Sequence, residues 1–231
     1  MLTRILSVGL LAGLLAGLLI AALQQVTTTP LILTAETYEK PVEVSSAAAA
    51  HAHTHAAHAE GWKPADGLPR FFFTAVTTVA TAVGVAFLLI GVMIFAGDEI
   101  DERRALAWAI AGFVACGLAP AAGLAPELPG SAAGGLVGRQ IWWAATAIAT
   151  GAALWAFLRG DHLMVRLGAI VLLLAPHVIG APHSHGFESK VPAELAAQFA
   201  AQSLVVQAFL WALVGLAVGL LWPRFAPRPA S

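Results

Sequence analysis

The sequence predicts an all-α integral membrane protein, a bundle of about six transmembrane helices with a long histidine-rich external loop between the first two. Apolar residues make up 59% of the 231 residues and charged residues only 11%, whereas soluble domains are roughly 25% charged. The apolar residues gather in six runs, each close to the ~20 residues that cross a bilayer. The lipid bilayer is therefore the first partner, and no room remains for a sizeable soluble domain.

The six runs form a single membrane domain that covers residues 1–231. The first run is too long for the apolar part of a signal peptide and lacks a clear cleavage site, so we retain it as a span. Its Gly9, Gly13 and Gly17 share one helix face, which favours close packing. We interpret residues 191–202 as a separate amphipathic approach to the last span. The spans are expected at about residues 5–23, 71–96, 105–124, 140–158, 163–181 and 203–222.

Residues 24–70 are the long hydrophilic stretch and are expected to form the external loop, with residues 27–30 closing the first helix. Its low-complexity segment, residues 45–60, contains half of all the histidines. A divalent borderline metal suits these imidazoles, because either an extended or a helical chain presents two or three of them on one side. The alternative is a solvated alanine-rich linker with incidental histidines. The candidate ligands are His51, His53, His55 and His58.

The stretch from Leu172 to His185 breaks an apolar run with Pro176 and then adds three histidines. Proline removes one backbone donor and clashes with the preceding turn, so carbonyl groups near Leu172 are freed at a depth where lipid cannot satisfy them. Polar backbone beside an imidazole suggests an ion path, although a kinked helix end followed by a polar loop is the alternative reading. The candidate ligands here are His177, His183 and His185.

The arginines indicate the orientation of the bundle, because cytoplasmic loops carry an excess of Lys and Arg. With six spans, both termini lie on one side, and that side receives the larger group of basic residues. Both termini are therefore predicted to be cytoplasmic, in a multi-pass protein of the inner (plasma) membrane. The first group is Arg4, Arg103, Arg104, Arg159, Arg166, Arg224 and Arg228, and the second is Lys40, Lys63, Arg70, Arg139 and Lys190.

This orientation places seven of the eight histidines on the outer face, together with Glu127 in a Pro/Gly-rich turn. Neutral imidazole is a common ligand for divalent transition metals near neutral pH. The pattern predicts a metal-collecting mouth outside, followed by a ligand-bearing helix that carries the ion inward. His162, on the cytoplasmic side, is expected to be a surface residue.

Three motifs resemble those of the CbtA family, a predicted cobalt transporter subunit of bacterial membranes. They are PELPG at residues 126–130, the Arg139-Gln140-x-Trp142-Trp143 that follows, and Pro176-His177-x-x-Gly180-Ala181-Pro182. The LTAETYE stretch near Glu36 and the first span are similar too, so the likeness covers nearly the full chain. The resemblance implies cobalt uptake linked to cobalamin synthesis, with cobalt as the transported substrate and a small single-span subunit, CbtB, as partner. The family is usually described with five spans.

Other functions remain open on the residues alone. Nickel or zinc competes with cobalt, because imidazole and carboxylate ligands do not single out one divalent metal. A non-transporting assembly subunit would use the histidine loop as a metal buffer. A membrane cytochrome would need two facing histidines within spans, and only His177 is expected inside one.

Several classes find no support. The net charge of −1 does not favour nucleic acid as a partner. No phosphate-binding glycine loop, nucleophile constellation or HExxH motif occurs, so the chain is not expected to be an enzyme or to bind an organic cofactor. Cys116, the single cysteine, is expected to be a small buried residue.

Overall fold

The computed structural model describes residues 1–39, 64, 65, 67–129, 135–183 and 189–226, and all regular structure within them is helical. Besides α-helices, the described residues form a π-helix, η1, and a 3₁₀-helix, η2. The elements are α1 Leu2–Val26, α2 Thr28–Glu39, α3 Leu68–Phe95, α4 Glu102–Phe113, η1 Val114–Leu118, α5 Ala119–Ala121, α6 Leu136–Arg159, α7 Leu163–Ile179, α8 Ala193–Leu221 and η2 Pro223–Phe225.

Five helical segments in the described part of the chain are long and apolar enough to cross a membrane. Over this part the protein is an all-helical, multi-pass membrane protein, as predicted. The first apolar run is among the long helices. The five segments are Leu2–Val26, Leu68–Phe95, Glu102–Ala121, Leu136–Arg159 and Ala193–Phe225.

The predicted span at residues 163–181 is a shorter apolar helix, so the count of six long spans is not confirmed. Helix α7 has 17 residues, about 25 Å at 1.5 Å per residue, against a hydrocarbon core of ~30 Å. It ends at Ile179 because Gly180 adopts φ 86°, a left-handed conformation that terminates a right-handed helix.

Two predicted boundaries need correction. The stretch of residues 24–70 begins as helix, since α1 continues to Val26 and α2 covers Thr28–Glu39. Thr27 alone interrupts the two helices, and its hydroxyl donates to the Leu23 carbonyl at 2.8 Å. At the other end of the chain, residues 191–202 are not a separate approach, because α8 runs unbroken from Ala193.

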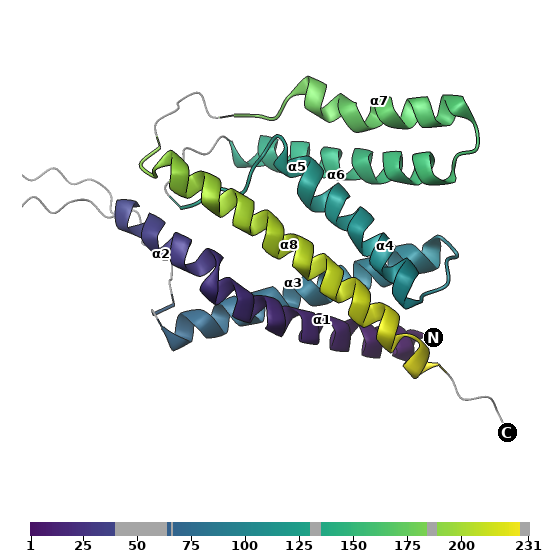
Figure 1. Ribbon diagram of the computed structural model, residues 1–231, viewed down its shortest axis with the longest axis horizontal. Helices are drawn as coiled ribbons and strands as arrows, with labels where there is room; N and C mark the ends of the chain where they lie inside the picture. The colour runs from purple at the N-terminus through teal and green to yellow at the C-terminus, as the bar shows by residue number, and fades with distance from the viewer. Residues whose placement is uncertain (40–63, 66, 130–134, 184–188, 227–231) are drawn as a thin grey trace, which may run out of the picture.

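Helix α8 crosses the middle of the bundle, with α1 and α3 on one side of it and α6 and α7 on the other (Figure 1). Glycines allow the closest contacts, as the spacing in the first run predicted. A Cβ on Gly13 would lie 2.4 Å from the Val83 Cα, and a Cβ on Gly215 would lie 2.5 Å from the Ala109 Cβ. Helix α1 therefore packs directly on the backbone of α3, and α8 packs closely on α4.

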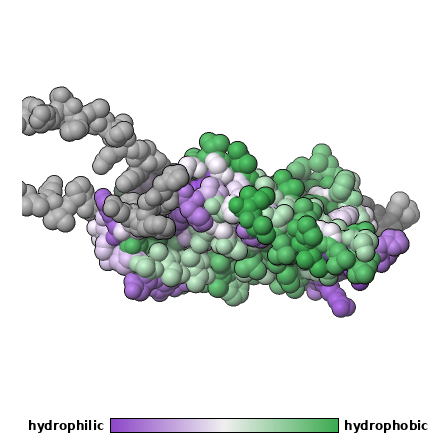
Figure 2. Space-filling model, turned by 90° about the horizontal axis from the view of Figure 1, so that it is seen from above, coloured by the Kyte–Doolittle hydropathy of each residue, from purple (hydrophilic) through white to green (hydrophobic). Residues whose placement is uncertain are grey.

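The two ends of the bundle contain different sets of contacts. At the terminal end, the Arg4 Nε donates to the Trp222 carbonyl at 3.0 Å, so both ends of the described chain lie together. At the loop end, Arg70 pairs with Glu36, and Ala35, Leu128 and Val191 form a small apolar cluster. Figure 2 shows a hydrophobic middle with hydrophilic residues gathered towards both ends of the visible face.

Candidate functional site

The C-terminal turn of α7 docks on α6 through Trp142, which is only 8% exposed. The Trp142 Nε1 donates a hydrogen bond to the Pro176 carbonyl oxygen at 3.2 Å. The His177 ring meets the Trp142 ring edge-on, with centroids 5.9 Å apart. A Cβ on Gly123 would lie 2.4 Å from Trp142, so the indole is also held by the chain that follows α5. His177 is thus fixed at the loop end, half-buried beside α6.

The residues after α7 stay close to the start of α6. Pro182 lies 3.8 Å from the position of a Cβ on Gly138, and His183 is exposed. Pro176 is buried and lies inside the last turn of α7, which continues to Ile179. His185 lies outside the described residues, so its position relative to His177 remains a prediction.

Glu127 lies in the connection between α5 and α6, at the same end as His177. Its carboxylate forms an ion pair with Arg139 at 2.7 Å, with the two side chains 36% and 19% exposed. The next residue, Leu128, is buried in the cluster with Ala35 and Val191, which anchors this connection. The predicted metal ligand therefore already has a cationic partner from its own neighbourhood.

The described residues contain no group of three or more His, Cys, Asp and Glu side chains placed to hold a metal ion. The structure does bring His177, His183 and Glu127 to one end of the bundle, without joining them into one ligand set. The histidines His51, His53, His55 and His58 lie outside the described residues. The chain leaves the described part after Glu39 and returns just before α3, and Glu36 and Arg70 place both points at the loop end.

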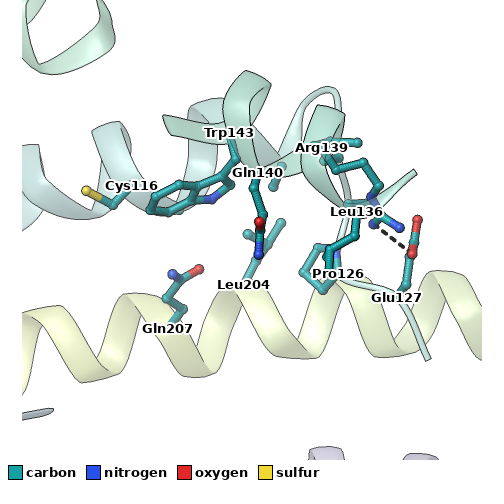
Figure 3. Close-up of a pocket in the computed structure, with 13 residues that line it drawn as sticks. Cys116, Pro126, Glu127, Leu136, Arg139, Gln140, Trp143, Leu204 and Gln207 are labelled. Carbon is teal, nitrogen blue, oxygen red and sulfur yellow. Dashed lines mark ion pairs between the residues drawn. The ribbon is translucent and has the colours of Figure 1, made fainter. Parts of the chain in front are cut away.

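A cavity of about 710 Å³ opens beside the Glu127–Arg139 pair, between η1, α6 and α8. Figure 3 shows the Gln140 side chain reaching from α6 towards α8, and the Gln207 side chain reaching from α8 towards Trp143. Cys116 lies at the far end from the ion pair, with its sulfur turned away from the amides in this view. The cavity is lined by Cys116, Gly117, Ala121, Leu124, Ala125, Pro126, Glu127, Leu136, Arg139, Gln140, Trp143, Leu204 and Gln207.

Our sequence reasoning missed Gln140 and Gln207 as site residues. A polar side chain in a membrane-spanning helix is costly unless it has a partner or meets water, so it marks a functional position. Gln207 stands within the predicted last span and Gln140 at the start of another. Both polar positions within apolar runs are visible in the sequence, but the histidines are the more conspicuous candidate ligands.

The terminal end carries a different polar cluster around Asp98, in the connection between α3 and α4. Its carboxylate accepts hydrogen bonds from the Trp108 Nε1 at 2.8 Å and from Arg159 at 2.7 Å. These contacts lower the pKa of Asp98, the Trp108 hydrogen bond most of all. The Arg159 guanidinium also lies 4.8 Å from the Trp155 ring centroid. The cluster ties α4 to α6 and lies at the opposite end from His177, near His162.

The helices and the cavity define a multi-pass helical membrane protein with a polar recess in its apolar bundle. The chain belongs to the CbtA family, whose description is "Probable cobalt transporter subunit" and whose family model matches residues 2–223. Neither the curated proteins nor the solved structures gave a match to the chain.

Membership of this family defines the general class. The protein is a cobalt transporter subunit, so it works in the bilayer together with at least one further subunit. The family description names cobalt as the transported substrate.

Proposed function

We propose that this protein is the membrane subunit of a cobalt uptake transporter that supplies cobalamin synthesis. External histidines collect the ion, and the end of α7 carries it into the bundle. The observation that carries the proposal is the location of His177, His183 and Glu127 at the same end of a CbtA-family bundle. Neutral imidazoles and a carboxylate are suitable ligands for a divalent transition metal.

The orientation of the bundle determines the direction of transport. Arg4, Arg104 and Arg159, which the positive-inside rule assigns to the cytoplasm, all lie at the terminal end. Arg70 and Arg139 lie at the loop end. We therefore propose cytoplasmic termini and an external loop end in the inner membrane. Chain ends on one side need an even number of crossings, so we count α7 as a crossing despite its length, the fifth of six in chain order.

Labelling of a Ser46→Cys variant with a membrane-impermeant thiol reagent tests this orientation. The proposal expects reaction in intact cells, because residue 46 belongs to the external segment. The parent, whose Cys116 is in the middle of the bundle, is the matched control. Protection in intact cells with reaction only after lysis would place residue 46 in the cytoplasm. The proposed orientation, and with it the proposed direction of transport, would then be wrong.

The histidine-rich segment acts as a collector in this proposal. His51, His53, His55 and His58 raise the metal concentration near the mouth, and His183 and His185 follow the end of α7. His177 is then the first ligand that the metal meets within the bundle. The partner would be a small single-span subunit similar to CbtB. Apolar residues on α7, such as Ile170, Val171 and Val178, are exposed and provide a surface for it or for lipid.

Uptake of radiolabelled cobalt and nickel into cells tests the function directly. Three kinds of cells are compared. They express the parent alone, the parent with its partner, or the His177→Ala variant in place of the parent. The proposal expects cobalt uptake that depends on the parent and increases with the partner. Preference for nickel or zinc would change the substrate, and binding without uptake would indicate a metal-buffering assembly subunit instead.

A further inference from the structure

Three buried side-chain atoms in the described residues lack a hydrogen-bond partner: Thr146 Oγ1, Thr150 Oγ1 and Gln202 Oε1. Both threonines are 0% exposed, and both are on α6. A threonine in a membrane helix ordinarily donates back to its own helix, as Thr77 and Thr81 of α3 do at 2.9 Å. A buried polar atom without a partner is costly, and it points to a water or an ion as its ligand.

The two threonines continue the polar side of the cavity. Arg139, Trp143, Thr146 and Thr150 follow one another at intervals of four, three and four residues, which places them on one face of α6. Arg139 and Trp143 line the cavity, so Thr146 and Thr150 extend the same face towards the terminal end. Polar groups therefore follow α6 inward from the Glu127–Arg139 pair.

The cavity wall opposite α6 has space for polar side chains. Cys116 and Gly117 of η1 line the cavity, and a π-helical turn of this kind is frequently found at functional sites. A Cβ on Gly117 would lie 2.8 Å from the Gln207 Oε1, so any residue other than glycine at this position would force the Gln207 amide to shift. Gln207 from α8 and Gln140 from α6 enter the same space from facing helices (Figure 3).

We propose that this cavity is the membrane-depth binding site of the transported divalent cation. The amide oxygens of Gln140 and Gln207 are its ligands, the hydroxyls of Thr146 and Thr150 receive it next, and the Glu127–Arg139 pair is the outer gate. This inference rests on the proposed function and names the route of its substrate. Neutral oxygens bind a partly hydrated divalent cation weakly, as passage requires, because a site that binds too tightly does not release its ion.

The ion pair explains how the site is closed at rest. The Arg139 guanidinium occupies the Glu127 carboxylate, so a cation gains that ligand only by displacing Arg139. Trp142, the neighbour of Trp143, contacts the His177 ring on the α7 side. His177 and the cavity wall are therefore connected through Trp142 and Trp143, adjacent residues of α6.

Valine substitutions distinguish a transport role from a merely structural one. Valine has the shape of threonine without the hydroxyl, so an unpartnered hydroxyl with no ligand would be replaced at no cost or with a gain in stability. We expect the Thr146→Val/Thr150→Val protein to keep or raise its melting temperature. Its cobalt uptake should fall about tenfold, since a polar group that contacts a charge contributes roughly that factor or more.

The matched control is Thr81→Val, which removes a hydroxyl that already bonds to its own helix. Gln207→Leu should reduce uptake at least as strongly as the double valine variant. Gly117→Ala provides a second approach, because its methyl group displaces the Gln207 amide. Its control is Gly84→Ala, where nothing lies within 4 Å of the added Cβ. If Gln207→Leu does not insert into the membrane, Gly117→Ala and the valine pair still decide the proposal.

Two measurements separate this proposal from the proposed function. Cobalt uptake is compared among cells that express the parent and the variants with the partner subunit, and cobalt-dependent thermal stabilisation is compared among the purified proteins. Parental uptake with normal uptake in all cavity variants would overturn the cavity site and leave the transport function standing. A parent without uptake of any divalent metal would remove the proposed function. Cobalt stabilisation of the parent that is unchanged in Gln207→Leu and Gly117→Ala would then overturn the cavity site as well.

Discussion

The indole N–H of Trp142 donates a hydrogen bond to the Pro176 carbonyl oxygen at 3.2 Å, and the same indole packs edge-on against His177. The proline and the histidine that the sequence singled out are therefore held by a tryptophan of another helix. The contact is consequential because α7 contacts no other helix than α6 among the described residues. The position of His177 depends on this one contact surface.

Trp142→Phe should loosen the end of α7 while leaving the bundle intact. The Pro176 carbonyl keeps the Gly180 N–H at 3.0 Å as a second partner, so it is not left unsatisfied. The expected cost is that of one ordinary hydrogen bond, about 1 kcal/mol of the free energy of unfolding, together with the packing of the larger indole ring against Gly123. Thermal denaturation in detergent measures this loss, and hydrogen exchange should increase at the end of α7 while α1 and α3 are unaffected. A loss of several kcal/mol would show that Trp142 supports more than this contact.

Cysteines at Gly138 and Pro182 should form a disulfide bond. The Pro182 Cβ lies 3.8 Å from the position of a Cβ on Gly138, which matches the mean Cβ separation of about 3.8 Å in disulfides. Oxidation of the Gly138→Cys/Pro182→Cys protein should therefore shift its mobility on a non-reducing gel after cleavage between α6 and α7.

Gly135→Cys/Pro182→Cys is the matched control pair, because no atom lies within 4 Å of a Cβ on Gly135. Equal cross-linking of both pairs would mean that the chain after α7 samples many positions. That result would contradict the packing of residue 182 on α6.

The fold could be predicted from the sequence where composition alone decides the outcome. Apolar runs indicated the long helices, and the spacing of Gly9, Gly13 and Gly17 indicated the face on which α1 meets α3. Helix α2 was missed because the polar residues near Thr27 and the proline at residue 30 were interpreted as a stop. Pro30 is in the first turn of α2, where a backbone N–H has no helical partner and proline is tolerated.

The site could be predicted only in part, since ligand sets depend on which helices meet. The sequence indicated that Glu127 and His177 belong to one side, and the structure places both at the loop end. It could not indicate that Arg139 occupies the Glu127 carboxylate, because an ion pair depends on the path of the connection between helices. That Gln140 and Gln207 line one cavity depends in the same way on where the fold places α6 and α8.

Acid should weaken the Asp98 cluster at the terminal end. The pKa of Asp98 is lower in the folded protein than in the unfolded chain, mainly through the Trp108 hydrogen bond and then through Arg159. The carboxylate therefore stabilises the fold fully above its unfolded pKa, near 4, and this contribution is lost as the pH falls through the folded value. Asp98→Asn should lower the melting temperature at neutral pH, and its difference from the parent should shrink in acid.

Glu99→Gln is the control for this titration. Glu99 pairs with Arg104, but its side chain is 84% exposed, and exposed pairs of this kind contribute little. Its melting temperature should follow that of the parent at every pH. A difference between Asp98→Asn and the parent that persists unchanged in acid would show that the carboxylate charge is not what stabilises the cluster.

Replacing the four loop histidines should change the affinity of uptake rather than its capacity. His51, His53, His55 and His58 stand in an alanine-rich segment, and ordering such a chain around a metal costs about 1 kcal/mol or more per residue fixed. We therefore expect capture to be weak and to raise the local metal concentration. The variant with all four changed to alanine should need more cobalt for half-maximal uptake while its maximal rate stays nearly intact. Complete loss of uptake at normal protein levels would make the segment a transport site instead.

His177→Ala should have the opposite signature, with uptake abolished at every cobalt concentration. His177 is the histidine that the structure places within the bundle, half-buried against Trp142 and one residue after Pro176. In the proposed route the metal exchanges its external ligands for this imidazole before it reaches the Glu127–Arg139 gate. A missing ligand at that step cannot be offset by more metal outside.

The matched control is His162→Ala, at the other end of the same helix and next to the Arg159 cluster. It should leave uptake unchanged, because the ion does not need an imidazole there to enter the bundle. Membrane levels of both variants are measured alongside uptake, so that loss of transport is not confused with loss of protein. Normal cobalt uptake by a stably inserted His177→Ala protein would remove His177 from the route and leave Pro176 with only a structural role in α7.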